Sequence, residues 1–143
     1  MFFHLSFFVY QFIFTSCSLE MSHNGHLDGF WQLTRVDTLA SGKSVDVGDK
    51  LLFLSVECDM LRLSDQLTAT VDCFCRFEQG NTTLRIYNPC RNDRPNGDPP
   101  LTDAAPLKPF GIESLDQTFD IEHLSSGAMT LCSHDLRLHY SKR

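Results

Sequence analysis

The chain has 143 residues and a formal net charge of −6 at pH 7, and 42% of its residues are hydrophobic. This length corresponds to one domain, which is large enough to bury a core without a metal or a disulfide framework. The acidic balance excludes the basic stripe that binds nucleic acid and the basic patch that attaches a protein to anionic lipid, so we expect no nucleic-acid partner.

The N-terminal segment, residues 1–14, is an apolar run without Asp, Glu, Lys or Arg, and the small pair Thr15-Ser16 and then Cys17 follow it. The run is too short to cross a membrane as a helix, which needs about 20 apolar residues. It matches the apolar region of a secretion signal, which is about 7–15 residues long and ends at small residues.

The residues Phe14-Thr15-Ser16-Cys17 resemble the lipobox of bacterial lipoproteins, in which signal peptidase II cuts before a cysteine that carries lipid. The resemblance implies a signal peptide over residues 1–16, a lipidated Cys17 and, over residues 17–28, a polar tether. Several acyl chains on one residue make detachment from a membrane very slow. We therefore expect a lipid-anchored protein of the bacterial cell envelope, on the periplasmic side or at the cell surface. A cleaved signal peptide with an incidental cysteine is the alternative.

After residue 28, apolar and polar residues alternate with period two, which is typical of half-buried strands. The pattern predicts about eight strands, over residues 29–38, 51–57, 60–64, 69–78, 83–88, 118–124, 128–133 and 136–141. The last three should form a meander with one apolar and one polar face, as in a closed or packed antiparallel sheet.

A proline-rich stretch interrupts this alternation, because all six prolines lie between residues 89 and 109. A central strand cannot run through such a segment, since proline has no N–H to donate to the ladder. Loops longer than about 12 residues are often functional. We expect this loop to act as a lid or as a partner surface.

The residues Gly29-Phe30-Trp31 at the start of the first strand, together with the number of strands, resemble the lipocalins, in particular the lipocalin-like domains of short bacterial lipoproteins. The resemblance implies an all-β fold over residues 29–143, an eight-stranded antiparallel up-and-down barrel. It also implies that Trp31 plugs the closed end of the barrel and that an arginine of the last strand, Arg137 or else Arg143, packs across the indole. A two-sheet β-sandwich is the alternative fold.

The interior of an eight-stranded barrel is either filled by side chains or just wide enough for one small ligand. A shift of one residue reverses which side chains face inward, so the alternation alone does not decide the lining. The candidates are apolar residues of the predicted strands: Trp31, Leu33, Leu54, Phe74, Phe77, Ile86, Phe119 and Met129. We expect a membrane-anchored protein that binds a small apolar ligand in its barrel. The alternative is a structural or interaction lipoprotein with a filled barrel, which docks a partner protein through its loops.

Five cysteines follow Cys17, and their disulfide pattern stays open: Cys58, Cys73, Cys75, Cys90 and Cys132. Cys73 and Cys75 lie on one face of the same strand, about 7 Å apart, which is too far for a disulfide between them. Each could instead form a disulfide with a cysteine of a neighbouring strand. Cys58 and Cys132 are the obvious partners. Zinc sites usually place two cysteines two to four residues apart on a turn, so we expect no metal. Catalytic and phosphate-binding motifs are also missing from the chain, so we expect no catalytic residues and no cofactor; a small barrel enzyme is the remaining alternative.

Overall fold

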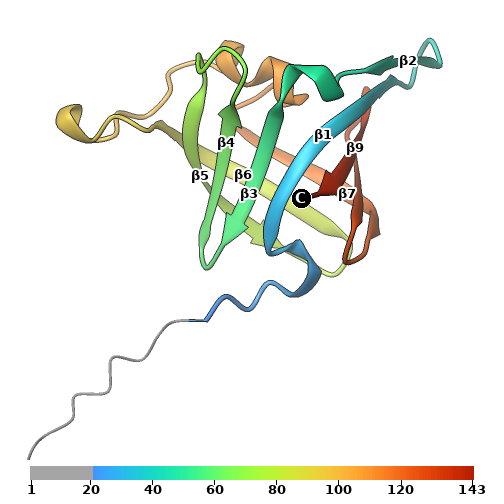
Figure 1. The fold of residues 1–143 in the computed structure, drawn as a ribbon, viewed down its shortest axis with the longest axis horizontal. Coiled ribbons are helices and arrows are strands. Elements are labelled where there is room, and N and C mark those ends of the chain that lie inside the picture. The colour runs from blue at the N-terminus through green and yellow to red at the C-terminus, as the bar shows by residue number, and fades with distance from the viewer. Residues whose placement is uncertain (1–20) are drawn as a thin grey trace, which may run out of the picture.

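The computed structural model describes residues 21–143, which form one antiparallel sheet that curls round on itself (Figure 1). The predicted signal peptide and Cys17 lie outside these residues. Within residues 21–143 the strands are β1 (Gly29–Thr38), β2 (Lys43–Asp46), β3 (Leu52–Glu57), β4 (Met60–Asp65), β5 (Asp72–Gln79), β6 (Thr83–Arg91), β7 (Asp116–Leu124), β8 (Ala128–Cys132) and β9 (Leu136–Lys142).

The sheet is closed because its first and last strands are hydrogen-bonded to each other. From β3 to β9 each strand pairs with the next one in the chain, and β1 pairs with both β3 and β9. The closing ladder places Trp31 opposite Lys142 and Leu33 opposite Tyr140. The predicted eight-stranded up-and-down barrel is therefore confirmed, and the alternative of two separate sheets is wrong.

The short strand β2 lies outside the ring of eight and was not predicted. It extends a hairpin from the end of β1, with Val36 opposite Val45, beyond the point where β3 stops pairing with β1. All four residues of β2 are exposed. Its side chains bury no apolar face, so the alternation that identified the other strands is missing here.

Alternation along the wall strands builds the core. Leu54 on β3 lies opposite Leu63 on β4, and both side chains are almost fully buried. Their neighbours Ser55 and Arg62 form the next pair of the ladder and face outward. Burying each leucine contributes about 1.5–3 kcal/mol, so this period-two pattern both selects the strand and specifies its register.

Strand β6 runs further than predicted, through Pro89 to Arg91. The register between β5 and β6 shifts here, so that Asn88 and Pro89 together lie opposite Cys75. Asn88 has a φ of 49°, and the extra residue makes this a β-bulge. The predicted strand end at residue 88 was wrong because a bulge tolerates a residue without an N–H. The Pro89 carbonyl still accepts a hydrogen bond, from the Leu101 N–H at 2.9 Å.

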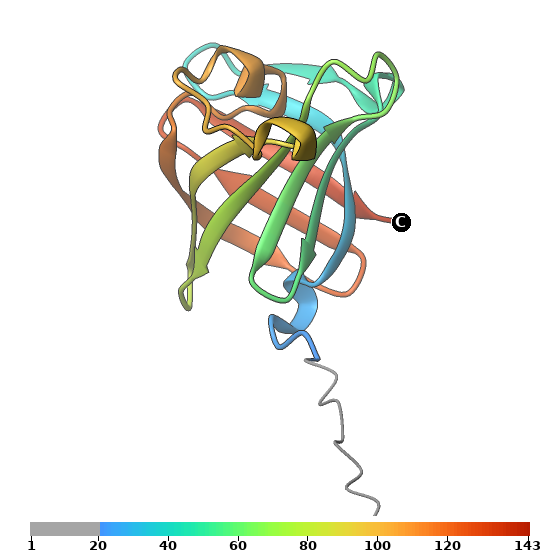
Figure 2. The ribbon, with the colours of Figure 1, turned by 90° about the vertical axis from the view of Figure 1, so that its left-hand side faces the viewer.

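Short 3₁₀ helices lie at both ends of the barrel. The chain enters through η1 (Gly25–Leu27) at the end where β1 begins, which we call the lower end. At the opposite, upper end lie η2 (Gly48–Lys50), η3 (Arg94–Asn96) and η4 (Ala105–Phe110). Figure 2 shows the long β6–β7 connection, with η3 and η4, lying across this upper end.

Candidate functional site

The lower end of the barrel is plugged by Trp31. Its side chain is fully buried, as is that of Leu27 in η1, and the indole Nε1–H donates to the Leu27 carbonyl at 2.8 Å. The cation over the indole ring is Lys142, whose Nζ lies 4.6 Å from the ring centroid. Lys142 Nζ also donates to the backbone carbonyls of His26 and Asp28.

The predicted pair of Trp31 and Arg137 is therefore wrong. Lys142 lies opposite Trp31 in the closing ladder and shares its face. Arg137 lies on the other face of β9, where it makes two hydrogen bonds to Glu122 at 2.6 and 3.1 Å. Arg143, the second candidate, donates to the Gln32 side chain at 2.6 Å.

The interior of the barrel holds most of the predicted lining residues. Six of them are buried in the central apolar cluster: Trp31, Leu33, Leu54, Ile86, Phe119 and Met129. Phe77 is half-buried and packs against that cluster. These placements fit an apolar lumen, while their contact with a ligand stays a prediction.

Phe74 faces away from the interior, so its prediction as a lining residue was wrong. Its neighbours Cys73 and Cys75 are buried at 3% and 2% exposure, and alternation then turns the ring between them outward. On the outer wall Phe74, Phe30 and Arg62 line a cleft of about 720 Å³. The Arg62 guanidinium lies 5.8 Å from the Phe74 ring centroid.

The upper end is plugged by side chains of the proline-rich connection. Leu107 and Phe110 of η4 and the following Ile112 are all buried, with exposures of 2% or less, and belong to the central apolar cluster. Gly111 has a φ of 74° and ends η4; a side-chain Cβ there would lie 2.5 Å from Leu138 of β9. We call residues 99–112 the lid, because they close the barrel with side chains and do not extend the sheet.

The proline-rich sequence predicts a loop that acts as a lid or as a partner surface, but it does not identify the side chains that fill the mouth. A signal for them exists in the chain, since Leu107 and Phe110 are three residues apart, which is the period of a 3₁₀ helix. Pro106 stands in its first turn and Gly111 at its C-cap, which are the positions these residues favour.

Two clefts flank the base of the lid. One of about 430 Å³ and one of about 210 Å³ share Arg91, Leu101 and Pro106 in their walls. Leu101 is half-buried against the apolar cluster. The apolar interior and the polar rim of the barrel therefore meet at these three residues.

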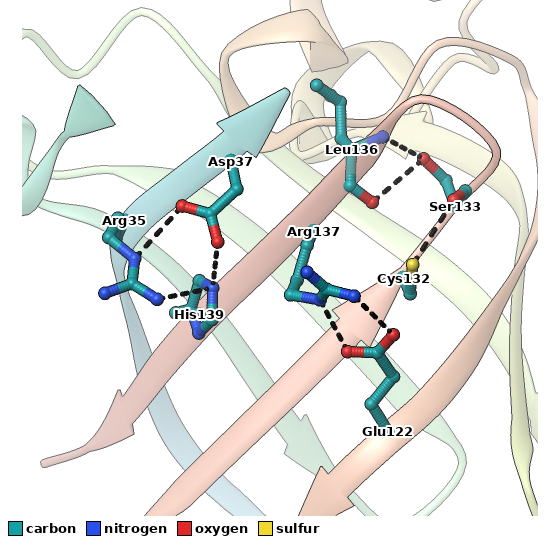
Figure 3. Close-up of polar contacts among 8 residues, drawn as sticks. All are labelled: Arg35, Asp37, Glu122, Cys132, Ser133, Leu136, Arg137 and His139. Carbon is teal, nitrogen blue, oxygen red and sulfur yellow. Dashed lines mark hydrogen bonds and ion pairs between the residues drawn. The ribbon is translucent and has the colours of Figure 1, made fainter. Parts of the chain in front are cut away.

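A polar network holds the seam where β9 closes the barrel against β1 (Figure 3). Asp37 on β1 accepts hydrogen bonds from Ser44 of β2 and His139 of β9, both at 2.7 Å, and pairs with Arg35 at 3.1 Å. The hydrogen bonds from Ser44 and His139 lower the pKa of Asp37 to about 2. Because the Ser44 hydroxyl donates to the carboxylate and not to the imidazole, this arrangement links three strands and does not activate a nucleophile.

Of the cysteines on the barrel wall, the two on β5 are buried, while Cys90 and Cys132 are half-buried. Cys73 and Cys75 are free thiols on the interior face, so neither forms the disulfide that we considered with Cys58 or Cys132. Burial raises the pKa of both thiols, that of Cys75 to about 12. Within residues 21–143, no group of three or more His, Cys, Asp or Glu side chains is placed to hold a metal ion.

In the part of the chain that the structure describes, we find no helix with the length and apolar character needed to cross a membrane.

Comparison with known proteins agrees with this architecture. A family model described as a lipocalin-like domain matches residues 12–143. A crystal structure of a lipocalin-like protein from Bacteroides uniformis is similar with a TM-score of 0.64 and 21% identity, over 83% of this chain and 100% of that one. An uncharacterized protein from Bacteroides eggerthii follows with a TM-score of 0.61 and 16% identity, over 82% and 99%. At these identities the likeness concerns the fold. No curated protein matches the chain.

Proposed function

Because the chain belongs to the lipocalin-like domain family, we propose that it binds a small apolar ligand in its barrel. We also propose that the ligand reaches the interior when the lid is displaced from the mouth. The observation that carries this proposal is the asymmetry between the two ends. At the lower end, the barrel is closed by Trp31 on a wall strand, with a hydrogen bond to Leu27 and a cation on its ring. At the upper end, it is closed by a loop whose side chains enter the mouth.

The lid has the properties of a displaceable plug. Its ends lie beside positions of positive φ, at Gly97 and at Gly111. Few hydrogen bonds join it to the wall: Pro99 accepts one from Arg91, and Leu101 donates one to Pro89. Segments held by few backbone bonds open at lower free energy than the strands around them. Removing Leu107 and Phe110 from the mouth would leave a concave apolar site, the kind that binds small molecules.

We further propose that the protein is a lipoprotein of the bacterial cell envelope, tethered through Cys17. The apolar run of residues 1–14 and the lipobox-like residues before Cys17 support this. The first described residues, from Met21 on, join the barrel at its lower end (Figure 1). A lipid at Cys17 would therefore leave the lid end, opposite to it, free to meet ligands.

A second candidate function is a structural or interaction lipoprotein that docks a partner protein. The dense packing of the interior favours it, because Trp31, Phe110 and Phe119 all have no exposed surface. In that case the side chains of the lid never leave the mouth. The outer cleft beside Phe30 and Phe74 then offers one apolar surface for a partner.

Native mass spectrometry of the protein after mild detergent extraction tests the two functions. Ligand binding predicts an adduct of small mass that is lost on collisional heating. An adduct-free protein that retains a second polypeptide would refute ligand binding and support docking. For the anchor, Cys17→Ala should move the protein from the membrane fraction to the soluble fraction, with Cys132→Ala as the control; continued sedimentation with membranes would contradict the anchor.

A further inference from the structure

Arg91 lies at the rim of the barrel mouth, on the interior face of the wall. It ends β6 and pairs directly with Cys73 of β5. Residues that lie opposite each other in a ladder project to the same face of the sheet. Cys73 is buried toward the interior, while Arg91, the last residue of β6 at the upper end, is exposed. The guanidinium is therefore held where the apolar interior meets solvent.

Arg91 differs from every other arginine in the part of the chain that the structure describes. Each of the others has an ion pair or a side-chain hydrogen bond, such as Arg62 with Asp72 at 2.7 Å and Arg143 with Gln32 at 2.6 Å. Within residues 21–143 the Arg91 guanidinium has neither. A guanidinium presents five N–H donors in a planar fork, which matches the two oxygens of a carboxylate or a phosphate.

The clefts at the base of the lid place this unpaired cation beside two apolar side chains of the lid. Both clefts contain Arg91 together with Leu101 and Pro106, and Leu101 packs against the central apolar cluster. From Pro106 the chain continues into η4, which carries the plugging side chains of Leu107 and Phe110. A ligand bound here would meet a cation at one end and the mouth of the lumen at the other.

The carboxylates in the two clefts are already engaged. In the larger cleft Asp72 receives two hydrogen bonds from Arg62, both at 2.7 Å, and one from Asn92 at 2.8 Å. In the smaller cleft Asp103 accepts the N–H of Ala105 at 2.8 Å. Because Arg62 compensates the charge of Asp72, Arg91 is the main uncompensated charge that an anion in the larger cleft would contact.

We propose that the ligand is an amphiphile with an anionic head group, a carboxylate or a phosphate, which binds Arg91 while its hydrocarbon chain replaces Leu107 and Phe110 in the mouth. This inference rests on the proposed binding function and adds the chemical class of the ligand. Arg91 acts as the specificity residue, because it distinguishes a charged head group from a neutral one of the same chain length.

Displacement of the neutral fluorescent dye Nile red tests the proposal in the purified protein. Three compounds with the same chain compete for the site: dodecanoate, dodecyl phosphate and the uncharged dodecanol. At least one anion should displace the dye at a concentration about tenfold lower than dodecanol, the size of effect expected of a charge-assisted hydrogen bond at a partly exposed site. Whether dodecanoate or dodecyl phosphate competes better identifies the head group.

Arg91→Gln should abolish this preference and leave competition by dodecanol unchanged. The matched control is Arg94→Gln, which removes the same charge from the exposed Arg94–Asp98 pair on the same loop and should retain the preference. Equal competition by all three compounds in the unmodified protein would overturn the inference, as would an anion preference that survives Arg91→Gln; in both cases the apolar site itself stands. If the protein does not bind the dye, calorimetric titration measures the binding of each compound directly. The absence of heat for all of them would overturn the proposed function and this inference with it.

Discussion

The substitution Phe110→Ala tests the lid most sharply, because it weakens the plug without touching the barrel wall. Phe110 has no exposed surface and lies in the central apolar cluster. Truncating a fully buried phenylalanine costs about 3–5 kcal/mol in stability, from lost transfer free energy and from the cavity. We expect the low end of this range, because a loop relaxes into a cavity more easily than a strand does. Urea denaturation followed by circular dichroism measures the loss.

The same substitution should strengthen the binding of Nile red. If the ligand must displace the ring, its apparent affinity is reduced by the small fraction of molecules with an open lid. Weakening the closed state by about 3 kcal/mol raises that fraction, so we expect the dissociation constant to fall at least about tenfold.

The control for Phe110→Ala is Phe53→Ala on the outer wall. Phe53 is 7% exposed and stacks on Phe30 with a centroid distance of 4.4 Å. This variant should lose comparable stability and leave dye binding unchanged. An equal change in dye affinity in the two variants, or no change in either, would refute the reasoning that the ligand competes with Phe110.

Three further predictions concern the rest of the barrel. Trp31→Ala should cost about 3–5 kcal/mol in urea denaturation; a loss below about 1 kcal/mol would mean that the indole does not plug the lower end. The pKa of Asp37 is lowered from 3.8 to about 2, so its carboxylate stabilises the fold above about pH 4 and stops doing so as the pH falls toward 2. The difference in melting temperature between the unmodified protein and Asp37→Asn should therefore shrink over that interval, and a constant difference would contradict it. Cys75, with a pKa of about 12, should resist iodoacetamide at pH 8 until urea unfolds the protein, as judged by peptide mass spectrometry; rapid labelling of the folded protein would show that the thiol is accessible.

Much of the wall follows from local patterning. Strand β1 spans the predicted residues 29–38, and β7, β8 and β9 start or end within two residues of their predictions. These strands have one buried and one solvated face, so each carries its own period-two signal. The alternation of Phe119 and Ile121 with Asp120 and Glu122 needs no knowledge of the partner strand.

The side chains whose positions were predicted wrongly are those whose placement depends on strand register and on barrel closure. Phe74 and Cys75 are adjacent in the sequence and both apolar, so their pattern does not say which of them faces the interior. Arg137 and Lys142 are both cations of β9, and the closing ladder alone places Lys142 opposite Trp31. The Asp37–His139 contact joins residues 102 positions apart, so it arises from barrel closure and from no local motif.

The long loop between residues 89 and 109 was predicted as a lid or a partner surface, but its contacts with the barrel were not predicted. Proline-rich sequence excludes a regular strand without specifying what replaces it. The burial of Leu107, Phe110 and Ile112 depends on the volume that the barrel leaves at its mouth, which is a property of the whole closed sheet. The same holds for Arg91, whose lack of an ion pair within residues 21–143 becomes visible only when the partners of the neighbouring carboxylates are known.

Hydrogen–deuterium exchange measured on residues 99–112 tests the displaceable lid most directly. The N–H groups of Leu101 and Gly111 bond to Pro89 and Lys108, both at 2.9 Å, and lie within the lid or at its contact with the wall. We predict that these amides exchange by local opening, faster than the amides of β3 and β4. Dodecanoate should change the exchange rates of the lid amides and leave those of the wall amides unchanged. Exchange of the lid amides only at the rate of the slowest wall amides, with and without dodecanoate, would contradict this and show that the lid is a fixed part of a filled barrel.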